Sequence, residues 1–171
     1  MKLLIVVDMQ NDFIDGMLGT PEAQAIVPAV VKKIRKYTTG DRAVMYTRDT
    51  HYEHYLETQE GKKLPIPHCI IGTKGWEIKD GLYTKDSIIV DKPTFGSKNL
   101  PLYISSNFHN IESIELVGLC TDICVISNAM LLKAYFSEIP IMVDSKCCAG
   151  VTPESHNNAL EAMKMCQIEI V

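Results

Sequence analysis

Residues 118–130 (GLCTDICVISNAM) contain a cysteine in a setting that favours nucleophilic chemistry. The apolar run 113–117 precedes them and is typical of a short buried strand, and apolar residues at helical spacing follow. Thr121 and Asp122 are suitable N-capping residues, which puts Cys124 in the first turn of a helix. Unpaired N–H groups and the helix dipole favour a thiolate there. Cys124 is therefore a candidate nucleophile, although most free cysteines are small buried hydrophobes.

The rest of the chain alternates short apolar runs with amphipathic segments. Two Thr-Pro-Glu sequences, at 20–22 and 152–154, are predicted to begin helices. Strands are predicted at 3–7, 43–47, 87–90, 114–117, 140–143 and 168–171. This alternation indicates an α/β fold in which helices cover both faces of a mostly parallel sheet of about six strands, a three-layer αβα sandwich. A chain of 171 residues is enough for one such domain, spanning 1–171.

Charged or nucleophilic side chains follow four of the predicted strands. In chain order these residues are Asp8, Asp49, Lys92 and Cys124. Ligands of an open parallel sheet bind at the carboxyl ends of its strands, so we expect the four side chains to meet along one rim. Each one alone is better explained as a solvated charge, a cap or a core residue. Their convergence favours a catalytic site.

The segment 49–86 interrupts the alternation. It contains several glycines and prolines, little periodicity, and the histidines His51, His54 and His68. A connection that long inside one domain is usually functional or disordered.

Bulk composition excludes several classes of protein. The formal net charge of −4 offers no electrostatic footprint for nucleic acid, and no apolar run approaches the length of a membrane span. The four basic residues between 32 and 36 are expected on the solvated face of a helix. The opening MKLLIVV is too short for a signal peptide, so we expect a cytoplasmic protein whose six cysteines stay reduced.

Five motifs, in order, resemble those of the isochorismatase-like cysteine hydrolases, the superfamily that contains the nicotinamidases. The resemblance covers the chain from residue 3 to about residue 156 and implies that family's Rossmann-like topology. The motifs are IVVDMQNDF (5–13), TRDTH (47–51), PHCIIGTKGWE (67–77), DKPTFGS (91–97) and GLCTDICV (118–125).

The resemblance implies that Asp8, Lys92 and Cys124 form a catalytic triad. Asp8 would accept the thiol proton, and the ammonium of Lys92 would stabilise the thiolate. Attack on an amide would release ammonia and leave a thioester for water to hydrolyse. The family pattern also implies a cis peptide between Leu119 and Cys120, with the N–H groups of Cys120 and Cys124 forming the oxyanion hole.

The resemblance further implies a metal site. Asp49 and His51 match the family's Asp-x-His pair, and His68 matches the histidine of its Pro-His motif. One carboxylate and two imidazoles suit a divalent metal, for which zinc is the first choice and iron or manganese the alternatives. In nicotinamidases this metal holds the pyridine nitrogen and so orients the carboxamide. Candidates for a further ligand are Glu60, Glu57 in reserve, and His54, which is equally well explained as an exposed loop residue.

Two positions bear on the substrate. Phe13 keeps one apolar wall of the pocket, but Pro65 stands where several nicotinamidases carry an aromatic residue that packs on the pyridine ring. The leading hypothesis is therefore a nicotinamidase-type amidase. One alternative is a related hydrolase of another small amide, carbamoyl or ureido compound. The other is a non-catalytic redox-sensing domain that retains the fold.

The remaining expectations concern partners and structural residues. We expect a small-molecule substrate and neither nucleic acid nor membrane as a partner. Family members are frequently dimers or larger, so a homo-oligomer is expected. Trp76 is assigned to core or loop packing, and Asp122 to a capping or structural role. His156 is expected in the first turns of the last helix with no part in the triad.

Overall fold

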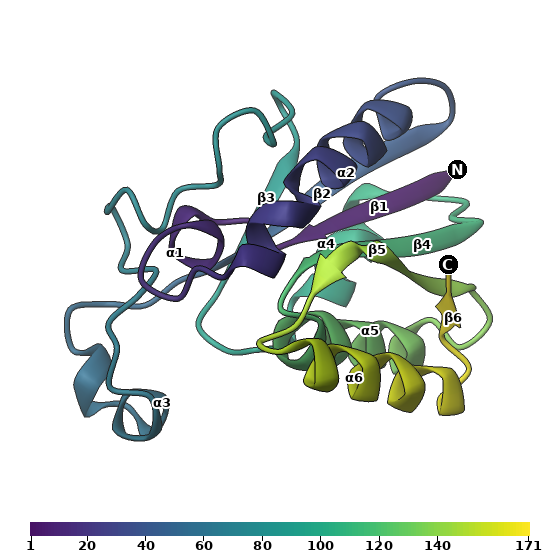
Figure 1. The fold of residues 1–171 in the computed structure, drawn as a ribbon. Coiled ribbons are helices and arrows are strands. Elements are labelled where there is room, and N and C mark those ends of the chain that lie inside the picture. The colour runs from purple at the N-terminus through teal and green to yellow at the C-terminus, as the bar shows by residue number, and fades with distance from the viewer.

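A parallel sheet of six strands forms the centre of the molecule in the computed structural model, which describes residues 1–171 (Figure 1). The strand order is β3-β2-β1-β4-β5-β6, and every neighbouring pair is parallel. The strands are β1 (Lys2–Val7), β2 (Arg42–Asp49), β3 (Ile88–Lys92), β4 (Ser113–Leu119), β5 (Ile141–Ala149) and β6 (Glu169–Ile170).

All six predicted strands are present, so the predicted α/β class is confirmed. β5 is longer than predicted, because the polar residues Asp144 to Lys146 end its apolar run while the chain continues as a strand to Ala149. Here the pairing of β4 with β5 shifts register between Leu116 and Gly118. Such irregularities are common where a strand is redirected beside a site.

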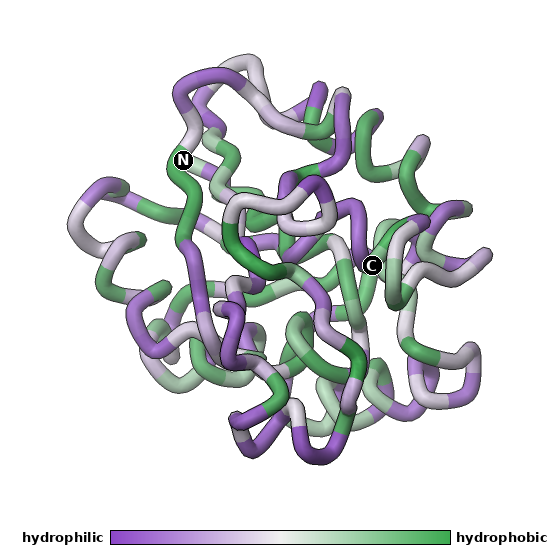
Figure 2. The backbone as a smooth tube through the Cα atoms, turned by 90° about the vertical axis from the view of Figure 1, so that its left-hand side faces the viewer, coloured by the Kyte–Doolittle hydropathy of each residue, from purple (hydrophilic) through white to green (hydrophobic).

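Helices cover both faces of the sheet and complete the three-layer sandwich. One buried apolar cluster joins the sheet to α1 and α2, and another joins it to α4, α5 and α6. Hydrophobic segments run through the interior, while many hydrophilic stretches lie on peripheral turns (Figure 2). The helices are α1 (Asn11–Ile14), α2 (Pro21–Tyr37), α3 (Gln59–Lys63), α4 (Leu100–Asn107), α5 (Ile126–Tyr135) and α6 (Pro153–Met165), with a 3₁₀ turn at Tyr55–Glu57 and a π-helical turn at Thr121–Val125. None of them is long and apolar enough to cross a membrane.

The two Thr-Pro-Glu sequences begin α2 and α6 as predicted. The hydroxyl of Thr20 accepts a hydrogen bond from the N–H of Ala23, and Thr152 forms a reciprocal capping box with Ser155. A proline follows each cap, where its missing N–H costs no helical hydrogen bond. These caps fix where each crossover returns to the sheet.

The centre of the sheet is where the strand order reverses, between β1 and β4. Val7 pairs with Thr47 on one side and with Gly118 on the other. Gly118 has φ 121°, and a Cβ there would lie 2.1 Å from the carbonyl oxygen of Val7. Only glycine fits both this conformation and this approach. The close contact brings the ends of β1 and β4 together at the switch point, where ligands of such sheets bind.

One basic residue of α2 does not lie on a solvated face as predicted. The ammonium of Lys33 is 2.5 Å from Glu115 Oε1 and 2.7 Å from Asp144 Oδ2, on the face of the sheet that α2 covers. The hydroxyl of Tyr37 donates to the other oxygen of Glu115, at 2.6 Å. The thiol of Cys147 belongs to the same group, since burial and the negative charge of Asp144 raise its pKa to about 12. We call these five residues the α2 cluster.

The long connection between β2 and β3 extends away from the sheet and carries α3 near its tip (Figure 1). It contains only short helical turns and isolated bridges, such as that between His51 and Ile70. Its functional assignment rests on the side chains that it directs toward the sheet.

Candidate active site

Four side chains meet at the carboxyl-terminal edge of the sheet, where the strand pattern predicted them. Asp8 directly follows β1, and Asp49 and Lys92 are the last residues of β2 and β3. Cys124 lies in the π-helical turn after β4. The parallel register pairs Asp49 with Lys92, so neighbouring strands end level with one another. We call these four residues the Lys92 cluster.

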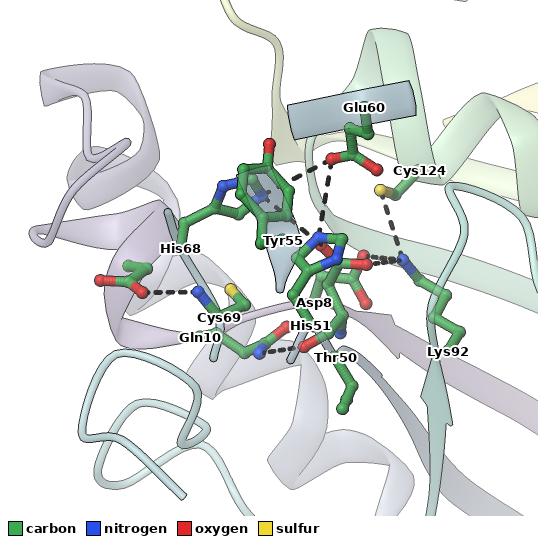
Figure 3. Close-up of polar contacts among 12 residues, drawn as sticks. Asp8, Gln10, Thr50, His51, Tyr55, Glu60, His68, Cys69, Lys92 and Cys124 are labelled. Atoms are coloured by element: carbon green, nitrogen blue, oxygen red, sulfur yellow. Dashed lines mark hydrogen bonds and ion pairs between the residues drawn. The ribbon is translucent and has the colours of Figure 1, made fainter. Parts of the chain in front are cut away.

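Lys92 is the centre of this cluster, and its side chain is fully buried. Its Nζ lies 2.6 Å from Asp8 Oδ2 and donates to Asp49 Oδ1 at 3.2 Å and to Cys124 Sγ at 3.4 Å (Figure 3). An ammonium has three N–H donors, so each partner can take one. Burial alone would lower the pKa of Lys92, but the charges of Asp8, Cys124 and Asp49 raise it well above its usual value. The amine therefore remains a cation.

Asp8 is held in a conformation that few residues other than glycine adopt. Its φ is 47°, in the left-handed region, and Thr47 donates a hydrogen bond to its Oδ1 at 2.7 Å. Burial raises the pKa of Asp8, and the positive charge of Lys92 only partly opposes this. A buried carboxylate with a raised pKa is a stronger proton acceptor than an exposed one, which suits a general base.

The local turn around Cys124 differs from the prediction. Thr121 and Asp122 do not cap the turn, because it begins after Cys120, which has no side-chain capping bond. The hydroxyl of Thr121 instead bonds Nδ1 of His156 at 2.7 Å. The Asp122 carboxylate accepts the N–H of Val151 at 3.2 Å, the structural role expected of it. These bonds join the turn to α6 and to the loop before it.

The pKa of Cys124 also differs from the expectation based on the start of a helix. Burial and the negative charge of Asp8 raise this pKa well above its usual value, and the positive charge of Lys92 compensates only in part. The resting group is thus a thiol beside a carboxylate. It becomes a nucleophile when its proton moves to Asp8.

The peptide bond between Leu119 and Cys120 is cis, as the resemblance implies. It lies at the junction of β4 and the π-helical turn. Both Cys120 and Cys124 line a cavity at this edge of the sheet, which is described below.

Four side chains of the β2–β3 connection and its entry form a possible metal-binding group. Each offers one ligand atom, and these atoms all lie within 4.8 Å of one another. Nε2 of His51 is 2.9 Å from Asp49 Oδ2 and 3.6 Å from Glu60 Oε1, and Nε2 of His68 is 3.8 Å from both oxygens. The group consists of Asp49, His51, Glu60 and His68.

The chemistry of these donors fits a cation better than it fits hydrogen bonding within the group. Nε2 of His51 is buried and makes no hydrogen bond of acceptable geometry. Nδ1 of His68 bonds the carbonyl oxygen of Ile66 at 2.8 Å, which leaves the Nε2 lone pair directed at the group. Two imidazoles and two carboxylates are the ligand types that suit zinc, iron or manganese.

The other predicted ligand candidates lie outside the group. His54 is exposed and stacks on Tyr52, with 6.0 Å between ring centroids, and Glu57 is exposed in the 3₁₀ turn. Glu60 enters the group because α3 directs its side chain back toward the histidines. Trp76 packs in the loop as expected, with its ring against Arg48 and its Nε1 donating to Thr50.

One cavity of about 890 Å³ is lined by all four residues of the metal group and by Cys124 of the Lys92 cluster. Asp49 belongs to both, since one carboxylate oxygen accepts from Lys92 and the other faces the histidines. Phe13 lines the cavity as predicted, and its ring contacts that of His68 at 5.5 Å between centroids. Cys124 also lines it, so the thiol and the metal group face the same space.

Sequence reasoning missed two buried polar residues that support the site. Thr47 holds the carboxylate of Asp8, and Gln10 bonds the backbone of Asp49. Both are polar residues within or beside apolar runs and both are fully buried. A polar residue in a segment that must be buried is the signal that could have identified them, because buried polar groups need hydrogen-bond partners.

Comparison with known proteins gives matches over nearly the whole chain. A model of the isochorismatase domain matches residues 2–171. The nicotinamidase/pyrazinamidase of Mycobacterium tuberculosis is 25% identical over 185 residues, which cover 100% of this chain and 98% of that protein.

Two solved structures are similar in both sequence and fold. The pyrazinamidase of Pyrococcus horikoshii in complex with zinc has a TM-score of 0.86 and 30% identity, covering 99% of this chain and 98% of that one. The N-carbamoylsarcosine amidase of Thermoplasma acidophilum has a TM-score of 0.82 and 27% identity, covering 99% and 95%. The sheet and its flanking helices are therefore common to all three chains.

Proposed function

This chain belongs to the isochorismatase family, and on that premise we propose that it is an amidase that cleaves a small amide with Cys124 as its nucleophile. The observation that carries the proposal is the arrangement around Lys92. One buried ammonium contacts the thiol of Cys124 and the carboxylate of Asp8, and the thiol lines a cavity large enough for a small molecule.

The proposed reaction begins with a proton transfer. The thiol of Cys124 gives its proton to Asp8 as the sulfur attacks the amide carbonyl carbon, and a C–S bond forms. The C–N bond then breaks, and Asp8 passes the proton to the departing nitrogen, which leaves as ammonia. Water attacks the resulting thioester, Asp8 accepts a proton from that water, and the C–S bond breaks. The products are a carboxylic acid and the free thiol, reprotonated by Asp8.

Lys92 keeps its proton throughout this cycle. Its charge offsets whichever of Asp8 and Cys124 is ionised, so a negative charge can move between oxygen and sulfur inside a buried site. The N–H groups of Cys120 and Cys124 are the proposed donors to the oxyanion. Both residues line the cavity into which the substrate would bind, which supports this assignment.

We further propose that Asp49, His51, Glu60 and His68 hold a divalent metal, with zinc as the first choice. Support comes from the donor set, the orphaned Nε2 of His51, and the zinc in the similar Pyrococcus horikoshii structure. When bound, such a metal supplies a positive centre that fixes a nitrogen or oxygen atom of the substrate.

The favoured substrate is a nicotinamide-type aromatic amide. The relatives named for nicotinamide and pyrazinamide support it, as does Phe13 beside the metal group. A carbamoyl or ureido compound is the second candidate. Pro65 is exposed and does not line the cavity, so no ring stacks on the substrate from that position. The similarity to N-carbamoylsarcosine amidase points in the same direction.

Ammonia release from nicotinamide, pyrazinamide and N-carbamoylsarcosine tests these proposals. We expect the zinc-supplemented protein to turn over one of the first two amides fastest. Cys124→Ala should lower kcat by at least ~10⁴-fold, the scale on which loss of a nucleophile acts. Cys147→Ala, a matched change at a buried cysteine outside the cavity, should leave kcat unchanged. Preference for the ureido compound would select the second candidate. No difference between Cys124→Ala and the unaltered protein would overturn the mechanism.

A further inference from the structure

Two buried polar side chains close to the site take no part in the proposed reaction. Gln10 and Asp12 lie just after Asp8, at the start of α1, and both are buried. Neither is a member of the metal group. Buried amides and carboxylates require partners, so the question is which groups these two side chains satisfy.

Gln10 bonds both backbone groups of the metal-group residue Asp49. Its Oε1 accepts the N–H of Asp49 at 2.7 Å, and its Nε2 donates to the carbonyl oxygen of Asp49 at 2.8 Å (Figure 3). The same Nε2 donates to the carbonyl oxygen of Trp76, at 2.8 Å. One planar amide therefore fixes the peptide groups on either side of Asp49 and attaches them to the β2–β3 connection.

Asp12 makes a similar contact beside His68. Its Oδ2 accepts the N–H of Cys69 at 2.7 Å (Figure 3). Cys69 has φ 47°, a left-handed conformation that its side chain disfavours, so the turn after His68 needs such a contact to persist. The carbonyl oxygen of Cys69 in turn accepts the N–H of His51 at 2.9 Å. The contact thus reaches both histidines of the metal group.

A glycine makes room for this carboxylate. A Cβ on Gly75 would lie 2.1 Å from Asp12 Oδ2, and the carbonyl oxygen of Gly75 accepts the N–H of Asp12 at 3.0 Å. The backbone of the connection therefore packs directly on the carboxylate. Any side chain at this position would displace the oxygen that bonds Cys69.

We propose that Gln10 and Asp12 are positioning residues for the metal group, holding Asp49 and His68 in place through their backbones. The inference rests on the proposed metal site. It adds that the segment after β1, which carries the general base, also supplies the two side chains that position the metal group relative to the thiol. Loss of such outer contacts typically weakens metal binding by roughly tenfold to a hundredfold.

Zinc affinity, measured by competition with a chromophoric chelator, tests this. Asp12→Ala removes the acceptor for the N–H of Cys69, and we expect zinc to bind roughly 10 to 100 times more weakly. Asp12→Asn keeps one acceptor oxygen and should recover most of the affinity. Gln10→Glu preserves the shape of the side chain but cannot donate to the two carbonyl oxygens, so it should also weaken binding.

Asp15→Ala is the matched control. Asp15 lies in the same segment after β1, and its carboxylate forms a 2.6 Å ion pair with Lys79 of the β2–β3 connection. This pair does not contact a residue of the metal group, so its loss should not change zinc affinity. The thermal midpoint of each metal-free variant and the alkylation rate of Cys124 report whether the variant is folded. A variant that is folded by both measures but binds zinc weakly has lost ligand geometry alone. If Asp12→Ala fails to fold, Gln10→Glu and Gly75→Ala make the same test.

The outcomes distinguish the two proposals. Folded variants at Gln10 and Asp12 that bind zinc as tightly as Asp15→Ala would overturn the positioning role alone. An unaltered protein that binds no zinc would overturn the metal site and, with it, this inference.

Discussion

The Lys92 cluster and the α2 cluster have the same ionic composition but differ in access and in hydrogen bonding. Each has one lysine between two buried carboxylates with a cysteine nearby. The thiol of the Lys92 cluster lines the 890 Å³ cavity, whereas no residue of the α2 cluster does. In the α2 cluster, a tyrosine hydroxyl satisfies the spare carboxylate oxygen. In the Lys92 cluster, Asp8 Oδ2 has no second partner of this kind, because only the ammonium of Lys92 contacts it.

This difference shows what marks a site in this molecule. Buried charge alone does not, because a fully paired cluster can serve only to join a helix to a sheet. An open cavity together with polar atoms left without partners indicates a place where a ligand completes the set. The following predictions separate the two clusters by function and by stability.

Removing one carboxylate charge from each cluster should give the largest contrast. Asp8→Asn removes the proton acceptor at nearly constant shape, so we expect kcat to fall roughly 10²- to 10⁴-fold. Glu115→Gln makes the matched change in the α2 cluster and should leave kcat within a few-fold of the unaltered protein. Steady-state ammonia release measures both. Asp8→Asn retaining more than a tenth of the activity would contradict the assignment of the base.

Removing the cation of the α2 cluster should affect stability instead. Lys33→Met leaves Glu115 and Asp144 close together without their shared partner, so the free energy of unfolding should fall by about 2–3 kcal/mol. Urea unfolding measures this change, and Lys32→Met, at an exposed neighbour, is the control. kcat per folded molecule should not change. Equal unfolding midpoints for the two variants would show that the cluster does not stabilise the fold.

The smallest expected effect is a change in the stability contribution of Asp144 at acidic pH. Burial alone would raise the pKa of Asp144, but its hydrogen bond and ion pair with Lys33 outweigh burial and lower it. A carboxyl group whose pKa is lower in the folded than in the unfolded state stabilises the fold at pH values above its unfolded-state pKa. This stabilisation is lost as the pH falls through the folded-state pKa. The stability difference between the unaltered protein and Asp144→Asn should therefore shrink from about pH 7 to about pH 3. Urea unfolding across that range checks this, and a constant difference would contradict it.

Much of the architecture could be predicted from the sequence, because the strands of a covered parallel sheet are continuous apolar runs. Their ends located Asp8, Asp49 and Lys92 without any knowledge of the long-range contacts. The second half of β5 could not be found this way, since Asp144 faces Lys33 and interrupts the apolar pattern. Its burial depends on a partner more than a hundred residues away.

The details of the site were harder to predict for the same reason. The pKa of Cys124 depends on burial and on Asp8, which outweigh the local effect of a helix start. The hydroxyl of Thr121 bonds His156 rather than capping its own turn. Both outcomes are set by residues distant in sequence. Motif order indicated which residues meet, but not how their protons and hydrogen bonds are shared.

The saturation of Lys92 limits how this enzyme can tell one amide from another. Its Nζ already contacts three partners within 3.4 Å, so its amine has no free donor for an arriving molecule. A guanidinium in its place would bring five donors in a rigid plane to a site built for three. Discrimination among amides therefore falls to the cavity walls and the metal group. The residues of the cavity walls and the metal group can therefore differ between enzymes that act on different amides, while the lysine is kept.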